Sequence, residues 1–300
     1  MNPELNTLLT TLYVLLTDRV LPDLGVSRDR RPGRKPGLSD AELLCLAVAQ
    51  QLLGYSSETR WIRYARTHLT GMFPAIPQQS GYNKRLRAAG TLISATITAL
   101  AKDTPSWHDV LRLVDSTPLP CGTSRETVKR SDLAGHAGYG YCASHSRFFW
   151  GFRLYLISTP EGMPVIWGLA NPKIGEREAT QALLEKDHHL VHAGQVILGD
   201  KGFAGKDFER FITDDLGAHL IRPDRKDEKP RFGKLGGIRQ WIESVFDTLK
   251  GQLTLEDHGG RTLEGVKARV AARLLALAAG IWHNWLTGAP RKRSLIAYDH

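Results

Sequence analysis

Residues 147–159 (RFFWGFRLYLIST) form a run of aromatic and branched side chains that is typical of a buried strand. The turn residues Pro160 and Gly162 follow, and then comes a second apolar run, MPVIWGLAN (163–171). Two such runs joined by a short turn predict an antiparallel hairpin. Because a sheet is stable only when at least one face is covered, this hairpin constrains the chain to a layered fold.

Three shorter runs extend the predicted sheet. VLRLVDS (110–116) precedes the hairpin, and QVILGD (195–200) and AHLIRP (218–223) follow it. Helical patterns at 176–190, 206–216, 238–250 and 263–286 accompany the later strands. This order predicts an α/β domain over residues 106–300, with a mixed five-stranded sheet flanked by helices.

Residues 1–105 are predicted to be an all-α N-terminal domain. Leucines at helical spacing between residues 5 and 16 predict a first helix that stops before Pro22. Ser39 and Glu42 form a capping box at the start of a second helix. Two further helices are predicted, over residues 56–69 and from about Ser80 onward.

These last two helices are basic. Consecutive short helices with a basic, N-terminally polar member are typical of a helix-turn-helix module that binds DNA, although solvated basic faces are the alternative. The predicted DNA-binding side chains are Arg60, Arg63 and Arg66 on the third helix and Lys84, Arg85 and Arg87 on the fourth.

The charge balance agrees with a polyanionic partner. The chain has 40 Lys and Arg against 31 Asp and Glu, a net charge of +9, and such a surplus favours binding to nucleic acid through counterion release. Residues 27–37 (SRDRRPGRKPG) add a basic loop, which is either a solvated linker or a phosphate contact.

Other features bear on location. The apolar stretch Leu274–Trp282 is too short to cross a bilayer. The N-terminus lacks a basic region and a cleavage site, so no signal peptide is expected. Three cysteines cannot build a disulfide framework. Together these features predict a cytoplasmic protein without a membrane span.

Three acidic residues occupy positions suited to catalysis. Asp115 ends the first predicted strand and Asp200 ends the fourth, and the carboxyl ends of neighbouring parallel strands form the usual ligand crevice of an α/β sheet. Glu243 lies on a later helix, where Arg239 and Lys250 share its face at 100° per residue.

Three converging carboxylates repel one another unless cations intervene, and hard oxygen ligands suit Mg²⁺, with Mn²⁺ as a substitute. Two such ions support in-line phosphoryl transfer. Arg239 and Lys250 are then predicted to bind phosphates beside the metal. The spacing alone, however, is also compatible with ordinary surface acids.

Four segments carry a resemblance to a known family: LVDSTPLP (113–120), YGYCASHSRFFWGFRLYLIST (139–159), LGDKGF (198–203) and IRQWIESVFDTLK (238–250). They resemble bacterial insertion-sequence transposases of the DDE superfamily, whose ribonuclease-H-like fold is shared with retroviral integrases. The resemblance covers residues 107–285 and, more loosely, the helical N-terminal half. Arg239, Glu243 and Lys250 also fit the signature Tyr-x2-Arg-x3-Glu-x6-Lys of one branch, with Gly236 at the tyrosine position.

The resemblance implies that Asp115, Asp200 and Glu243 are catalytic residues and ligands of Mg²⁺ or Mn²⁺. Water would cleave the DNA at each end of the insertion sequence and release a 3′-hydroxyl group. That hydroxyl group would then attack a phosphodiester of the target DNA. The implied partners are the terminal inverted repeats and the target DNA. Because the two ends of the insertion sequence must be held together, a homodimer on DNA is also implied. Lys201, beside Asp200, is expected to contact DNA together with Arg239 and Lys250.

The sequence is also compatible with other functions. The chain could be a catalytically inert DNA-binding regulator or domesticated remnant, or an endonuclease that cuts without joining. His258, Arg261 and Tyr298 make a faint match to tyrosine recombinases. Trp150, Trp167 and Trp241 are expected in the core and not as base-stacking residues, with Trp241 the one nearest to Glu243 in the sequence.

Overall fold

The computed structural model describes residues 3–25, 36–122, 124–142, 146–225, 228–229, 231–233 and 235–299. Most of the basic loop 27–37 therefore lies outside the described residues. By packing, the chain divides into two compact units, residues 1–103 with 249–300 and residues 104–248. Every helix within the described ranges is too short or too polar to span a lipid bilayer.

The second unit is built on a mixed sheet with the order β2-β3-β1-β5-β6, in which β4 also pairs with β3. The strand β3 is antiparallel to β1, β2 and β4, whereas β5 is parallel to β1 and β6 is parallel to β5. The strands are β1 (Leu111–Gly122), β2 (Gly138–Cys142), β3 (Arg147–Ser158), β4 (Pro164–Ala170), β5 (Val196–Leu198) and β6 (His219–Ile221).

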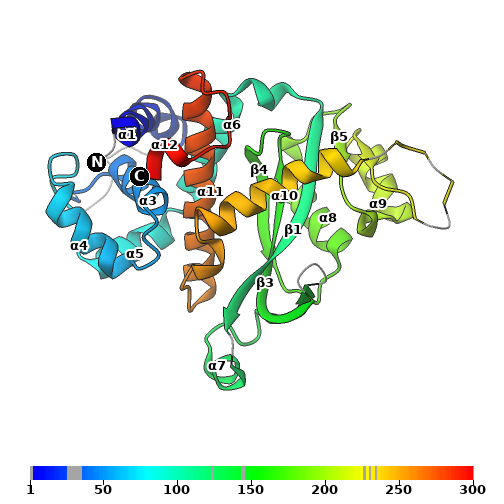
Figure 1. Cartoon of the computed structure of the whole chain (residues 1–300), viewed down its shortest axis with the longest axis horizontal. Coiled ribbons are helices and arrows are strands. Elements are labelled where there is room, and N and C mark those ends of the chain that lie inside the picture. Colours follow the sequence, from blue (N-terminus) through cyan, green and yellow to red (C-terminus); the bar gives the residue numbers. More distant parts are fainter. Residues whose placement is uncertain are drawn as a thin grey trace. The chain divides into compact units, whose positions relative to one another are not determined.

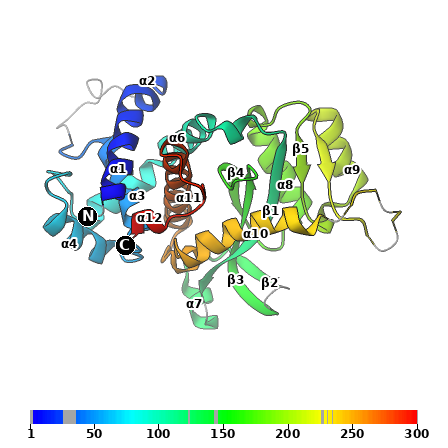
Figure 2. The same ribbon diagram turned by 45° about the horizontal axis from the view of Figure 1, so that its top comes forward.

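The predicted fold class, a mixed sheet flanked by helices, is confirmed, and all the strands expected from the sequence are present. One strand, β2, was not expected. It pairs with residues 147–151 of β3, while β4 pairs with residues 153–158, so the two short strands share one edge of β3 (Figure 2).

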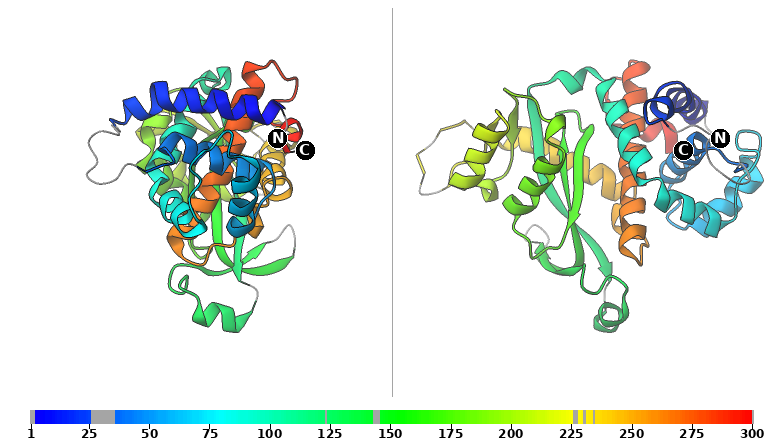
Figure 3. Two further views of the ribbon diagram at one scale, coloured as in Figure 1. Left: turned by 90° about the vertical axis from the view of Figure 1, so that its left-hand side faces the viewer. Right: turned by 180° about the vertical axis from the view of Figure 1, so that it is seen from behind.

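Helices cover both faces of this sheet. The helix α10 (Gly236–Gly251) crosses one face, and α8 (Glu176–Lys186) lies on the other (Figures 1 and 3). The short helices α7 (Arg125–Arg130) and α9 (Lys206–Arg210) follow β1 and β5 along the chain. On α10 the apolar stripe is buried at Ile242, Val245 and Phe246, as its spacing predicts.

The strand β1 continues past its predicted end at residue 116. Beyond Leu113 it is paired with β3 but no longer with β5. Pro118 and Pro120 are compatible with a strand there, because a strand with one open edge tolerates residues without an N–H donor. Asp115 therefore lies within β1 and not at its end.

The first unit is all helical over the described residues 3–102, as predicted. It contains α1 (Pro3–Leu15), α2 (Leu21–Asp23), α3 (Asp40–Leu52), α4 (Glu58–His68), α5 (Gln79–Ala88), α6 (Gly90–Lys102), α11 (Leu263–Leu286) and α12 (Ile296–Asp299). The capping box of Ser39 and Glu42 is present at the start of α3. Five residues join α3 to α4, and Gly54 among them has a φ of +70°, which glycine adopts without strain.

Two features of the first unit differ from expectation. The helix α11 packs against α3, α5 and α6, although the sequence assigned residues 263–286 to the second domain. Its residues from Val270 to Trp282 are all buried, and a helix that is apolar on every side needs neighbours all round. The first helix also does not stop before Pro22, because a π-helical turn at Leu16–Val20 carries the backbone into α2. Such a turn accommodates a proline in a helix.

Glu58 joins three helices of the first unit. Its carboxylate, on a residue that is only 6% exposed, accepts hydrogen bonds from Gln79 and Asn83 of α5 at 2.8 to 3.0 Å. Arg269 of α11 forms an ion pair with it at 2.8 Å. Because a buried charge is stable only when it is paired, these contacts link α4 to α5 and α11.

We expect Glu58→Gln to destabilise the first unit by about 2 kcal/mol, because Arg269 loses its anion and the amide donors lose a charged acceptor. Urea unfolding followed by circular dichroism measures this change. Glu264→Gln is the matched control, since Glu264 is an exposed residue of α11 whose ion pair within the described ranges is with Lys267. Equal unfolding free energies for the two variants would contradict the assignment.

Candidate active site

The pairing of β1 with β5 sets the centre of the site. The two strands run parallel, with Leu113 beside Leu198. Asp115 and Asp200 each lie two residues further along, so the same register brings their carboxylates to the same level at the point where β5 ends. This juxtaposition follows from backbone pairing and agrees with the position expected from the sequence.

Asp115 is in an unfavourable place for a charge. The pKa of its carboxyl group is raised to about 6, mainly by burial, with smaller contributions from the charges of Asp200 and Glu176. The backbone N–H of Ser116, which donates to Asp115 Oδ1 at 2.7 Å, and the guanidinium of Arg239 act in the opposite direction. The carboxylate therefore needs a cation when it is ionised.

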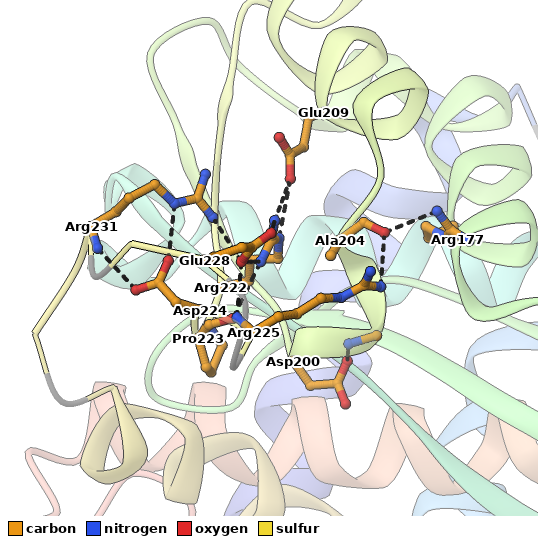
Figure 4. Close-up of polar contacts among 11 residues, drawn as sticks. Arg177, Asp200, Ala204, Glu209, Arg222, Pro223, Asp224, Arg225, Glu228 and Arg231 are labelled. Carbon is orange, nitrogen blue, oxygen red and sulfur yellow. Dashed lines mark hydrogen bonds and ion pairs between the residues drawn. The ribbon is translucent and has the colours of Figure 1, made fainter.

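Asp200 is held by the turn that follows β5. Its Oδ1 accepts a hydrogen bond from the N–H of Gly202 at 2.7 Å. Two arginines support the next residues of this turn, because Arg177 and Arg225 donate to the carbonyl of Ala204 at 2.9 and 3.4 Å (Figure 4). The backbone thus holds the carboxylate of Asp200, and Arg177 of α8 and Arg225 hold the turn that follows it.

Glu176, which the sequence did not single out, also lies here. It is the first residue of α8, and its Oε1 accepts a hydrogen bond from Ser116 Oγ at 3.1 Å. Arg153 of β3 lies 3.4 Å from the same oxygen and donates to Ser116 Oγ at 3.0 Å. A glutamate in the first turn of a helix is common, so the local pattern alone did not identify it.

The helix α10 brings Arg239 to the site. Arg239 lowers the pKa of Asp115 through its charge, and its Nη2 lies 4.0 Å from Glu243 Oε1. The Glu243 side chain is 55% exposed. The structure thus brings Arg239 near Asp115, with Glu243 one helical turn further along α10.

The donor chemistry fits a hard divalent cation. Asp115 and Asp200 offer carboxylate oxygens, the hard ligands that Mg²⁺ and Mn²⁺ prefer. Within the described ranges, no three His, Cys, Asp or Glu side chains converge closely enough to form a complete metal site. The two aspartates are therefore the part of the predicted trio that the fold brings together.

A cluster of ion pairs anchors the segment between β6 and α10 (Figure 4). Arg222, whose side chain is 4% exposed, binds Glu209 at 2.9 Å and Glu228 at 2.7 Å. Asp224 pairs with Arg231 at 3.0 Å. These contacts tie the described residues of this segment to one another and, through Glu209, to α9.

The remaining predicted residues of this region differ in their surroundings. Lys201 is exposed, whereas Lys250 lies 3.9 Å from Glu256. Trp241 is 42% exposed, so its expected place in the core is wrong, because it projects from the polar side of α10. Trp150 is buried as expected.

Tyr298 does not offer an accessible nucleophile. The residue is 1% exposed, and its hydroxyl group contacts His283 Nδ1 at 2.9 Å and donates to Asn284 Oδ1 at 2.5 Å. The faint match to tyrosine recombinases therefore has no structural support.

The basic residues of α4 and α5 fall into two groups. Arg85 donates to the carbonyl of Leu38 at 2.6 Å and to Asp40 at 2.7 Å, so it joins α5 to the start of α3. The others have exposed side chains: Arg60, Arg63, Arg66, Lys84 and Arg87. The exposed group forms the candidate DNA surface of the first unit.

Comparison with known proteins identifies a protein family that this chain matches. A family model described as "Transposase DDE domain" matches residues 106–279, which is more than half of the chain. The matched segment contains Asp115, Asp200 and Glu243. A search of curated proteins finds no significant match.

We expect Asp115→Asn to stabilise the metal-free protein at neutral pH. The pKa of Asp115 is about 6 in the folded chain and 3.8 when unperturbed. Between these pH values the unfolded chain has lost the proton that the folded chain retains, so wild-type stability falls as pH rises. This pKa difference destabilises the folded wild type by about 3 kcal/mol. The destabilisation is fully present above pH 6 and absent below pH 4.

Urea unfolding in the presence of a chelator, at pH 4 and pH 7, measures this effect. The Asn variant should match the wild type at pH 4 and exceed it at pH 7. Asp214→Asn, at an exposed position, serves as the control and should change neither value. A variant no more stable than the wild type at pH 7 would show that burial of Asp115 carries no such cost.

Proposed function

The chain belongs to the family of transposases with a DDE domain, and from this premise we propose that it cuts DNA at the ends of an insertion sequence and joins them to target DNA. Asp115, Asp200 and Glu243 are the proposed catalytic residues. The observation that carries the proposal is the register of β1 and β5, which sets Asp115 and Asp200 side by side inside the segment matched to the family.

Asp115, Asp200 and Glu243 would hold the divalent cation. Bound Mg²⁺ or Mn²⁺ supplies activation of the attacking oxygen and stabilisation of the leaving oxygen in phosphoryl transfer. The protein's own contribution is to keep both aspartates in fixed positions, through the N–H groups of Ser116 and Gly202. Preorganised groups of this kind lower the barrier because they need no rearrangement during the reaction.

Basic residues would orient the DNA. Arg239, beside Asp115, and the exposed Lys201 are suited to bind the phosphates on either side of the reacting bond. Lys250 is a third candidate on α10. In the first unit, α3 and α4 are joined by a short turn, and α4 presents Arg60, Arg63 and Arg66 as a recognition helix would.

Double-stranded DNA is the proposed partner, both as terminal inverted repeats and as target. Two ends of one element must be held during joining, so we propose that two copies of the chain act together on DNA. The inert regulator and the non-joining endonuclease remain distinct outcomes of the experiments below.

Glu243→Gln should lower the rate of Mg²⁺-dependent cleavage of labelled end DNA by about 1,000-fold or more, because a lost charged group at a phosphoryl-transfer site costs several kcal/mol. Binding of the same DNA should be nearly unchanged. Asp247→Asn, at an exposed position one turn further along α10, is the matched control and should cut normally.

Undiminished cutting by Glu243→Gln would refute its catalytic role. In the wild type, cutting without joined products identifies an endonuclease. Binding of end DNA without either reaction identifies a regulator.

The double variant Arg60→Ala, Arg63→Ala should bind end DNA more weakly and reduce the slope of log affinity against log salt by about 2, one unit for each lost phosphate contact. Fluorescence anisotropy at several salt concentrations measures both quantities. Lys186→Ala removes an exposed charge from α8 and controls for net charge alone. An unchanged slope would remove α4 from the DNA surface.

A further inference from the structure

Glu176 is linked to the proposed metal site by a single residue. Ser116 donates its backbone N–H to Asp115 Oδ1 at 2.7 Å and its hydroxyl to Glu176 Oε1 at 3.1 Å. Because neighbouring strand residues point to opposite faces, Ser116 connects the carboxylate of Asp115 to the helix α8 on the other side of the sheet. Glu176 is thus held in a defined position and is not a freely solvated acid.

Gly202 shows how near Glu176 is to Asp200. A Cβ atom placed on Gly202 would lie 2.8 Å from Asp200 Oδ1 and 2.8 Å from Glu176 Oε2, so these two oxygens are at most twice that distance, 5.6 Å, apart. Two ligands of one Mg²⁺ lie up to about 4.2 Å apart. A small side-chain movement therefore lets both oxygens share one cation, in the space that glycine leaves open.

The other neighbours of Glu176 leave its second oxygen available to this space. Arg153 and Ser116 both contact Oε1, whereas Oε2 is the oxygen that faces Gly202. The hydroxyl of Tyr155, a residue 1% exposed, lies beside Ser116 and Glu176 but makes no hydrogen bond of normal geometry to any described residue. A buried polar group without a protein partner is a common mark of a site that takes a ligand or water.

The basic groups nearby leave the oxygens at Gly202 without a cationic partner. The charges of Asp200 and Glu176 both act on Asp115. Among the described residues, Arg153 pairs with Glu176 Oε1, Arg239 acts on Asp115, and Arg177 and Arg225 donate to the carbonyl of Ala204. None of these contacts goes to the oxygens that border Gly202. Clustered carboxylates of this kind are stable in the ionised form when a divalent ion lies between them.

We propose that Glu176 is a further ligand of the divalent cation that Asp200 binds, so that the metal site draws on α8 as well as on β1, β5 and α10. Arg153 is then a positioning residue that holds Glu176 Oε1. This inference rests on the proposed metal-dependent function, but it concerns a residue that the Asp-Asp-Glu set does not include.

Binding of Mn²⁺ to the full chain without DNA tests the proposal, by isothermal titration calorimetry. Glu176→Gln should weaken the affinity by about tenfold or more, as the loss of one charged ligand does. Glu178→Gln, at an exposed position in the same turn of α8, is the matched control and should bind like the wild type. Mn²⁺ should also raise the unfolding temperature of the wild type more than that of Glu176→Gln.

The outcomes separate the two proposals. If Asp115→Asn and Asp200→Asn lose Mn²⁺ while Glu176→Gln retains it, only this inference fails. If the aspartate variants also bind like the wild type, the metal site itself is absent and the proposed function falls too.

A second variant covers the case in which Glu176→Gln does not fold. Ser116→Ala keeps every acid but removes the hydroxyl that holds Glu176, and it should weaken Mn²⁺ binding by a few-fold. Unchanged affinity in a folded Ser116→Ala variant would contradict the positioning of Glu176 through Ser116.

Discussion

The parallel pairing of β1 with β5 forces two like charges into each other's neighbourhood. Asp115 and Asp200 are two residues past a paired position on adjacent strands, so the backbone keeps them close to each other. Burial and the charge of Asp200 both raise the pKa of Asp115. The second unit therefore holds a repulsive arrangement by means of its backbone, and the energy for this comes from the strands and helices packed around it.

Much of the fold could be predicted because its signals are local. Branched and aromatic runs identified the strands, and Ser39 with Glu42 identified the start of α3. The position of α11 could not be predicted, because its apolar pattern shows only that it is buried and not which elements cover it. The strand β2 is short and rich in glycine, and it is formed by pairing with β3 and not by its own propensity.

In the candidate site, too, some residues could be predicted from the sequence and others could not. Asp115 and Asp200 were predictable because the ends of parallel strands meet at one edge. Glu176 was not, since its relation to Asp200 is visible only across the backbone of Gly202. Arg85 shows the opposite error: a basic residue on an amphipathic helix is a reasonable DNA contact until Asp40 is found beside it. Trp241 was expected in the core, but its position on α10 leaves it exposed.

The acids of the site are held in two different ways. Asp115 and Asp200 are fixed by N–H groups of the backbone, which do not rearrange when a substrate arrives. Glu243 is contacted instead by Arg239 at 4.0 Å, a long ion pair on a partly exposed helix face, and such pairs contribute little. A DNA phosphate offers Arg239 a stronger, bidentate partner. If the proposed function holds, a bound DNA phosphate therefore competes with Glu243 for Arg239 and displaces this weak ion pair.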